Sequence, residues 1–187
     1  MFDKYLSTFK DVLKSLVIFD NKGIAISEEI SWSILSQKLN ETKNKNATIY
    51  LIGNGGSNAI ISHASVDFLN TCKIKAVPLT NGSQLTCFAN DFGYEQVFVK
   101  PLETLISKED ILIAVSSSGF SKNIINGVEV AKNIGAFIVT LSGFKSDNAL
   151  KQIGDINFWL NSNHYGMVEI GHSLILHYIS DRFSNKL

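Results

Sequence analysis

LIGNGGSNAIISHASVDFL, residues 51–69, is the stretch that decides the fold. It begins as the end of an apolar run, passes through a loop with glycines at 53, 55 and 56, and continues at helical spacing. A buried strand that turns through glycines into a helix is typical of parallel α/β sheets, where helices connect neighbouring strands. We therefore expect residues 46–187 to form an α/β core.

Short apolar runs alternate with amphipathic stretches along the rest of this core. The runs that we interpret as strands buried on both faces are 47–53, 75–79, 110–116, 136–142 and 156–160. Helical stretches are expected near 58–71, 94–106, 121–134, 145–152 and 166–183. This alternation predicts a doubly wound, five-stranded parallel sheet with helices on both faces.

The first 45 residues carry apolar positions at helical spacing in two stripes, separated by a break at 21–23. The first stripe is Phe2, Leu6, Phe9, Leu13, Leu16 and Val17, and the second is Ile26, Ile30, Ile34, Leu35 and Leu39. This pattern predicts an N-terminal helical hairpin. With 187 residues, 45% of them hydrophobic, the chain suits a single domain, 1–187, with a substantial core.

Charge and cysteine usage exclude several classes of protein. Lys plus Arg and Asp plus Glu are balanced at 17 each, so we expect small neutral or anionic ligands and no nucleic-acid partner. Cys72 and Cys87 form no C-x-x-C pattern, and we interpret both as reduced thiols. The N-terminus is interrupted by charges, and nowhere do 18 consecutive apolar residues occur. No signal peptide or membrane span is expected, and the protein is predicted to be cytoplasmic.

The loop GNGGS, 53–57, leaves the first core strand and opens a helix. Ligands of such sheets lie beyond the carboxyl ends of the strands. Glycines let the backbone approach a ligand, and a helix N-terminus offers N–H groups that favour a phosphate or polyol oxygen. The loop is not a G-x-G-x-x-G fingerprint, since Asn58 stands at the third position, and it lacks the Gly-Lys-Ser/Thr end of a Walker loop. The alternative is a tight strand-to-helix turn.

A second loop, SSSGFS at 116–121, also lies between a buried strand and a helix. Its four hydroxyls can donate several hydrogen bonds to an anion, although Ser121 alone would be explained as a helix cap. Neither loop contains Lys or Arg. We therefore expect a phosphomonoester held by hydroxyls, backbone amides and a helix dipole, which suits a phosphosugar better than a nucleoside triphosphate with magnesium.

Two further segments carry polar residues that can serve a site. His63 and Asp67 stand at i and i+4, on one helical face, so they can converge on one ion or one substrate. A lone histidine there is otherwise a surface or core residue. In TNGSQLTCFANDFGYEQVF, 80–98, the turn-prone Asn90-Asp91 either closes over the ligand or only shapes an elbow between helices.

Taken together, these motifs resemble a known family. GNGGS followed by His63, then ANDFGY (89–94), SSSGFS, TLSG (140–143) and EIGHSLILH (169–177) are similar to the SIS (sugar isomerase) domain family and to its phosphoheptose isomerase branch. The resemblance implies conversion of sedoheptulose 7-phosphate to a heptose 7-phosphate, used in surface polysaccharide synthesis. It also implies a homotetramer with active sites shared between subunits.

The resemblance also implies roles for individual residues. Asp67 would be the general base and His177 the general acid, passing a proton between C1 and C2 through an enediol. One zinc ion per site would be held by His63, Asp67, Glu169 and His177. The substrate and its phosphate would be bound by Asn54, Gly55, Gly56, Ser57, Asp91, Ser116, Ser117, Ser118 and Ser121.

The sequence departs from the family pattern at four positions. Asp67 replaces a glutamate, Glu169 a glutamine, Gly166 an aspartate, and Thr71 stands where an arginine is common. Glu169 and His177 are also about 12 Å apart along a straight helix. Either the helix starts late or bends, so that one metal reaches both residues, or each residue belongs to a different site.

Two functions therefore stay open. The first is a metal-assisted aldose–ketose isomerase. The second is a non-catalytic SIS module that senses a phosphosugar or binds a protein partner.

His172, at i+3 from Glu169, is expected on the same helical face, as a core or supporting residue.

Overall fold

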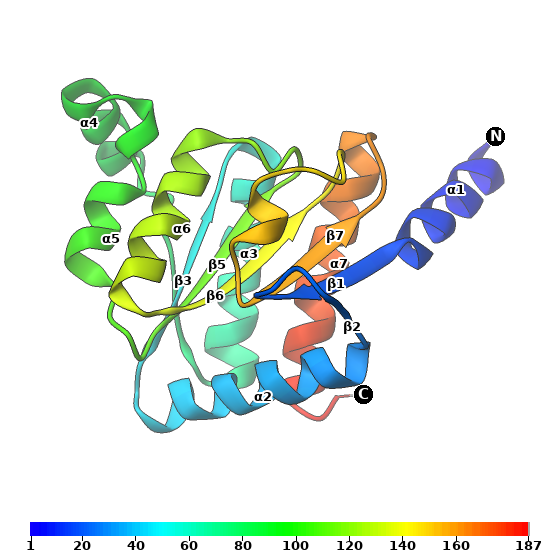
Figure 1. Cartoon of the computed structure of the whole chain (residues 1–187), viewed down its shortest axis with the longest axis horizontal. Helices are drawn as coiled ribbons and strands as arrows, with labels where there is room; N and C mark the ends of the chain where they lie inside the picture. Colours follow the sequence, from blue (N-terminus) through cyan, green and yellow to red (C-terminus); the bar gives the residue numbers. More distant parts are fainter. Residues whose placement is uncertain (187) are drawn as a thin grey trace.

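The structure is a computed structural model that describes residues 1–186, and its centre is one mixed sheet (Figure 1). The strand order is β2-β1-β7-β6-β5-β3-β4. Strands β3 to β7 are parallel to one another, whereas β1 is antiparallel to both β7 and β2. The five predicted strands are present: β3 Thr48–Gly53, β4 Lys75–Pro78, β5 Ile111–Ser116, β6 Phe137–Ser142 and β7 Ile156–Leu160. The prediction of a five-stranded, wholly parallel sheet is nevertheless too small, because β1 and β2 extend it to seven strands.

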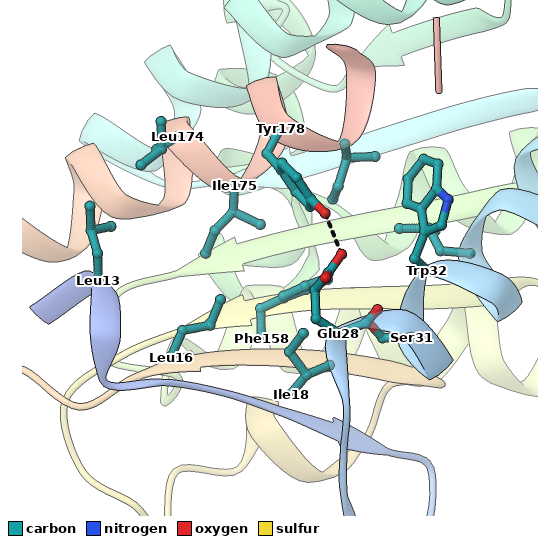
Figure 2. Close-up of a pocket in the computed structure, with 12 residues that line it drawn as sticks. Leu13, Leu16, Ile18, Glu28, Ser31, Trp32, Phe158, Leu174, Ile175 and Tyr178 are labelled. Carbon is teal, nitrogen blue, oxygen red and sulfur yellow. Dashed lines mark hydrogen bonds between the residues drawn. The ribbon is translucent and has the colours of Figure 1, made fainter. Parts of the chain in front are cut away.

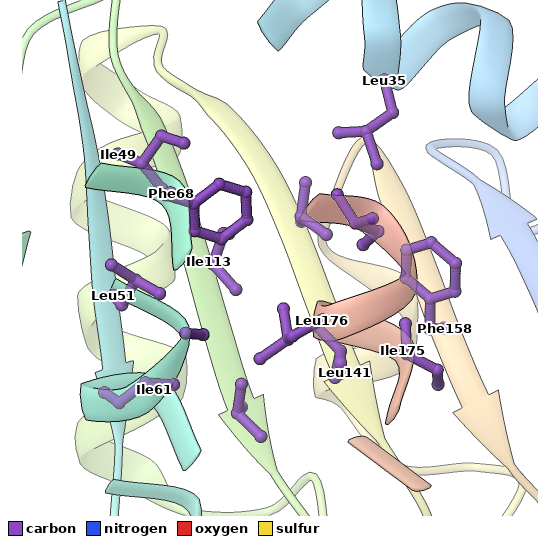
Figure 3. Packing of buried hydrophobic residues seen from close by; sticks show 14 of the residues in the cluster. Leu35, Ile49, Leu51, Ile61, Phe68, Ile113, Leu141, Phe158, Ile175 and Leu176 are labelled. Carbon is purple, nitrogen blue, oxygen red and sulfur yellow. The ribbon is translucent and has the colours of Figure 1, made fainter. Parts of the chain in front are cut away.

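Helices cover both faces of this sheet, as the sequence predicts. One face packs against α2 (Glu28–Asn44), α3 (Gly55–Asp67) with the π-helical turn η1 (Phe68–Cys72), and α7 (Tyr165–Phe183). The other packs against α5 (Val99–Leu105) and α6 (Lys122–Ile134). Side chains of β3 alternate between the two cores: Leu51 faces the first and Ile52 the second, and both are fully buried. Figure 3 shows the first core, where Phe68, Ile113 and Leu176 lie between the sheet and the helices.

The predicted N-terminal helical hairpin is wrong. Helix α1 (Phe2–Lys14) does form, but Leu16–Asp20 is strand β1 and Ala25–Ile26 is strand β2. Asp20 stabilises the turn between them by accepting hydrogen bonds from the backbone N–H groups of Lys22 and Ile24. The β-branched and aromatic run LVIFD pairs along its whole length with β7, which outweighs its helical spacing. Helix α1 extends away from the body of the molecule, and only Val12 in it is buried (Figure 1).

Three other segments differ from expectation. The stretch 145–152 is mostly a loop, with only the short 3-10 turn η3 (Leu150–Gln152), because the Asn148 side chain bonds backbone groups around it. Helix α4 (Gly82–Phe92) is additional. The expected helix 94–106 is divided into the 3-10 turn η2 (Tyr94–Gln96) and α5. Within residues 1–186, no helix is long and apolar enough to cross a membrane.

Asn157 ties the added strands to the parallel sheet. It lies fully buried on β7, and its Oδ1 accepts hydrogen bonds from Thr140 Oγ1 at 2.7 Å and from Gly154 N–H at 2.9 Å. Its Nδ2 donates to the carbonyls of Gly154, Phe19 and Asp20 at 2.9–3.4 Å. One amide therefore links β1, β6 and β7.

We expect Asn157→Ala to lower the free energy of unfolding by about 3 kcal/mol, because it leaves several buried polar groups without partners. Urea denaturation, monitored by circular dichroism, measures the free energy of unfolding of each variant. Asn126→Ala is the matched control: its amide makes one exposed hydrogen bond to the Glu95 carbonyl, so its loss should stay within about 0.5 kcal/mol. Equal losses in the two variants would contradict this role of Asn157.

Candidate active site

The glycine loop joins β3 to α3 through a tight turn. Gly53 ends the strand, and a Cβ placed there would lie 2.9 Å from the carbonyl carbon of Ser57. Gly55 begins the helix at φ +51°, a conformation that favours glycine. The chain therefore turns within two residues. The first N–H groups of α3 then lie at the carboxyl end of the sheet, where they can bind an anion.

The serine loop, residues 116–121, follows the neighbouring strand β5. Gly119 has φ +67°, and its N–H donates to the carbonyl and to the Oγ of Ser116 at 3.1 and 3.2 Å. Ser116 Oγ in turn lies 3.3 Å from Ser121 Oγ. The loop thus folds back on itself, which gathers its hydroxyls at one place.

The two loops enclose one cavity of about 110 Å³. Of the residues predicted to bind substrate, six line it: Asn54, Ser57, Ser116, Ser117, Ser118 and Ser121. Gly55 and Gly56 lie beside it, exposed, in the first turn of α3. Within the described chain its lining contains no Lys or Arg, and its one charged residue is Glu169. The cavity can therefore bind a small anion only through hydroxyls, amides and the helix dipole.

Asparagine amides brace the two loops against each other. Asn54 and Asn123 exchange two hydrogen bonds of 2.9 Å, and Tyr94 donates from its hydroxyl to Asn54 Oδ1 at 3.0 Å. Sequence reasoning assigned no individual role to Asn123 or Tyr94, although Tyr94 ends the ANDFGY segment (89–94). Asn123 stands in the first turn of α6, directly after the serine loop, and that position was the signal that could have identified it.

Asp91 lies outside this cavity. It is exposed near the C-terminal end of α4, where it accepts hydrogen bonds from Cys87 Sγ and Asn90 Nδ2. The bond to Asp91 raises the pKa of the Cys87 thiol. Within one chain the structure therefore does not bring Asp91 to the substrate loops.

A second group of polar residues lies where α3 and α7 meet. Nδ1 of His177 lies 3.1 Å from Asp67 Oδ2, and Nε2 of His63 lies 3.9 Å from the same oxygen. The two imidazole rings are 5.1 Å apart. All three side chains are at least partly exposed, so a substrate or ion can reach them.

This His/Asp/His group can bind a metal ion. Its potential ligand atoms lie within 4.8 Å of one another, and within residues 1–186 it is the one such group found. Two imidazole nitrogens and one carboxylate are a donor set found in catalytic zinc sites, where three protein ligands leave a position open. The residues present therefore fit a divalent transition metal.

Glu169, the fourth predicted ligand, lies elsewhere. It lines the cavity beside the serine loop, and a Cβ added at Gly56 would lie 2.3 Å from its Oε1. Helix α7 runs without a break from Tyr165 to Phe183, so Glu169 and His177 stay about 12 Å apart along its axis. In one chain, Glu169 belongs to the anion cavity rather than to the His/Asp/His group.

His172 is a core residue of α7. It is fully buried, and its Nε2 lies 3.1 Å from the carbonyl oxygen of Ser142 at the end of β6. Burial lowers the pKa of His172 to about 4. The ring is therefore neutral at physiological pH, and it fixes α7 against the strand next to the serine loop.

Comparisons with known proteins agree with this geometry. The model of the SIS domain family matches residues 9–143. A phosphoheptose isomerase from Helicobacter pylori strain P12 is 31% identical over 180 residues, which cover 91% of this chain and 93% of that protein. Another, from Aliarcobacter butzleri strain RM4018, is 35% identical over 153 residues, covering 79% of this chain and 80% of that protein.

Solved structures show the same fold. The phosphoheptose isomerase of Neisseria gonorrhoeae superposes with a TM-score of 0.72 at 27% identity, covering 81% of this chain and 84% of that one. The phosphoheptose isomerase of Francisella tularensis reaches a TM-score of 0.78 over 98% of both chains, and at 23% identity this likeness concerns the fold alone.

The neutral state of His172 makes stability depend on pH. Since the pKa falls from an ordinary 6.5 to about 4 on folding, the unfolded chain binds an extra proton between these values. The stabilisation that comes from a neutral His172 is therefore fully present above pH 6.5. As the pH falls from 6.5 toward 4, the free energy of unfolding decreases by up to about 1.4 kcal/mol per pH unit.

The measurement is the free energy of unfolding from pH 7 to pH 4.5, for the wild type and for His172→Gln. The wild type should lose more stability over this range than the variant, because only the wild type carries the imidazole. Parallel pH profiles would show that His172 is not the group responsible.

Proposed function

Because the chain belongs to the SIS domain family and to its phosphoheptose isomerase branch, we propose that it is an aldose–ketose isomerase that converts sedoheptulose 7-phosphate to D-glycero-heptose 7-phosphate. The observation that carries the proposal is the contact between Asp67 and His177, an acid–base pair accessible to substrate. We further propose that residues 1–187 act as one domain, in the cytoplasm, where the free thiols of Cys72 and Cys87 would stay reduced.

The cavity between the two loops suits the phosphate of this substrate. Hydroxyls of Ser118 and Ser121 and N–H groups at the start of α3 would donate hydrogen bonds to its oxygens. Because the cavity has no cation, hydrogen bonds from fixed directions would hold the phosphate, and not an opposite net charge. The phosphate then anchors the far end of the sugar and leaves the reacting carbons free to reach an acid and a base.

Asp67 and His177 would carry out the proton transfers. In the ketose the carbonyl is at C2, so Asp67 removes a proton from C1 while His177 protonates the oxygen on C2, which gives an enediol. Return of a proton to C2, with loss of the proton on the C1 hydroxyl, gives the aldose. General acid–base catalysis of this kind typically contributes a factor of about 10² to 10⁴ in rate.

We propose zinc as the metal of the His/Asp/His group. His63, Asp67 and His177 would hold it. When bound, zinc would polarise the sugar carbonyl and so make the neighbouring C–H more acidic. Asp67 is one methylene shorter than the glutamate expected of the family, yet it contacts His177 directly.

The two halves of the site are far apart in one chain. Gly55 and Asp67 are separated by about 18 Å of helix, at about 1.5 Å per residue. The seven carbons of the sugar span at most about 9 Å, since each C–C bond is about 1.5 Å long. We therefore propose that the loops of one copy work with the His/Asp/His group of a second copy, where Glu169 and Asp91 can also approach it.

Exposed apolar surface supports assembly of several copies, and we propose the homotetramer implied by the family resemblance. Val66 and Leu69 near the end of α3, and Ile170 and Leu174 on α7, are each about half exposed. Phe2, Tyr5 and Leu6 are exposed on the projecting helix α1. A short helix with an uncovered apolar side is marginal in water, so it favours a partner.

A groove near the C-terminal end of α1 could accommodate such a helix. It has a volume of about 470 Å³ and a mostly apolar lining from α1, β1, α2, β7 and α7. Figure 2 shows Leu13, Leu16 and Trp32 around it, and the hydrogen bond that Tyr178 donates to Glu28. We propose that helix α1 of a second copy occupies this groove.

The activity is tested with Asp67→Asn and His177→Asn. Each variant should lower kcat with sedoheptulose 7-phosphate by at least about a hundredfold, because Asp67→Asn removes the base at unchanged side-chain size and His177→Asn removes the acid. The measurement is formation of the aldose, together with the metal content of each purified protein. Zinc should be present in the wild type and reduced in both variants.

Asp181→Asn is the matched control, since Asp181 is a partly exposed carboxylate on α7 whose ion-pair partner is Lys186. It should keep wild-type turnover. Binding of sedoheptulose 7-phosphate by the wild type without turnover would contradict the isomerase and indicate a phosphosugar-binding module.

Site sharing is tested by mixing two inactive variants. Asp67→Asn spoils the acid–base pair, and Ser118→Asp places a repelling charge in the phosphate loop. After the subunits are exchanged under mild denaturant, an equal mixture should recover roughly a quarter of wild-type activity, because random pairing restores one intact site in each mixed pair.

Two observations check this mixing experiment. Each variant treated alone should stay inactive, and native mass spectrometry, which distinguishes the two variants by subunit mass, should detect oligomers that contain both. A mixture as inactive as its parts, with exchange verified by mass, would show that each site lies within a single chain.

A further inference from the structure

We propose that Tyr165 is a specificity-determining residue that packs its ring against the carbon chain of the sugar phosphate. This inference rests on the proposed function, since it concerns the ligand of the same cavity. Tyr165 lines the cavity together with the serine loop, yet the residue is 60% exposed. No motif in the sequence points to this tyrosine.

The size of the cavity places the sugar at its rim. A volume of about 110 Å³ is well below the roughly 300–1,000 Å³ of pockets that enclose a whole small molecule. The cavity therefore holds little more than the phosphate, and the carbon chain has to leave it past the surrounding side chains. Tyr165 and Glu169 are the two lining residues from α7, and the other lining residues belong to β5 or to the two loops.

The ring of Tyr165 is held in place before any ligand binds. It packs edge-on against Phe144, with ring centroids 4.7 Å apart and an interplanar angle of 81°. Phe144 itself has φ +56°, which is unfavourable for an aromatic residue, and its N–H donates to the Ser162 carbonyl at 2.9 Å. Strained backbone of this kind tends to occur at functional sites.

The start of α7 adds a second support. Tyr165 is the first residue of this helix, and His164 caps it by accepting a hydrogen bond from Met167 N–H on Nδ1 at 3.4 Å. The backbone of Tyr165 is therefore fixed. An aromatic ring that is already ordered but uncovered binds at a low cost in conformational entropy.

The chemistry of the rim selects a neutral chain. The flat face of a tyrosine favours C–H groups, as on one side of an extended polyol, while the carboxylate of Glu169 disfavours a second anionic group there. A phosphomonoester whose remaining carbons carry only hydroxyls satisfies both conditions. Inorganic phosphate would occupy the same cavity but has no carbon chain to pack against the ring.

The test compares two ligands by titration calorimetry. Tyr165→Ala should weaken binding of sedoheptulose 7-phosphate about tenfold, with KM raised to match, while affinity for inorganic phosphate stays within about twofold. Tyr165→Phe keeps the ring and should stay within about twofold of the wild type for both ligands. Phe92→Ala removes an exposed aromatic side chain of α4 outside the cavity and should change neither affinity.

Each other outcome overturns the inference. Equal weakening of both ligands by Tyr165→Ala would mean that the residue only shapes the loops, and equal losses in the Phe and Ala variants would assign the effect to the hydroxyl. Unchanged binding in the Ala variant would remove the residue from the site. If the wild type binds the sugar phosphate without isomerising it, the proposed function fails, while the calorimetric comparison still decides the role of Tyr165.

Discussion

The register between β3 and β5 is the constraint on which the candidate site depends. Gly53 is paired with Val115, so the glycine loop and the serine loop leave adjacent parallel strands at the same level. The reciprocal amide bonds between Asn54 and Asn123 then hold the two loops at a set separation. Because neither loop has a cation, their hydroxyls and N–H groups can bind a phosphate only if this geometry is kept.

The rigidity of α3 and α7 explains why the polar groups form two clusters. Both helices start beside the cavity between the two loops, and Asp67 and His177 follow about 3.3 turns later on their respective helices. Within one chain the phosphate cavity and the Asp67 carboxylate are therefore kept apart, which limits their electrostatic repulsion. We propose that a second copy completes the site across this separation.

Most of the parallel core could be predicted from the sequence, because buried strands and the loops that follow them leave local patterns. The N-terminal region could not, since β1 becomes a strand by pairing with β7, some 140 residues later in the chain. The stretch 145–152 has helical spacing, but the bonds of Asn148 hold it as a loop. At the site, the loop motifs and the i, i+4 pair of His63 and Asp67 were visible. Tyr165 was not, because only the folded chain brings the start of α7 next to the serine loop and to Phe144.

The two ends of the sheet have a consequence for how copies of this chain can meet. On one side the outermost strand, β2, has only two residues, and on the other β4 has four and ends in Pro78, which lacks an N–H donor. Such short borders offer too few free backbone groups for a neighbouring molecule to extend the sheet. The short edge strands therefore disfavour polymerisation through backbone pairing and leave the apolar helix faces as the surfaces through which copies could associate.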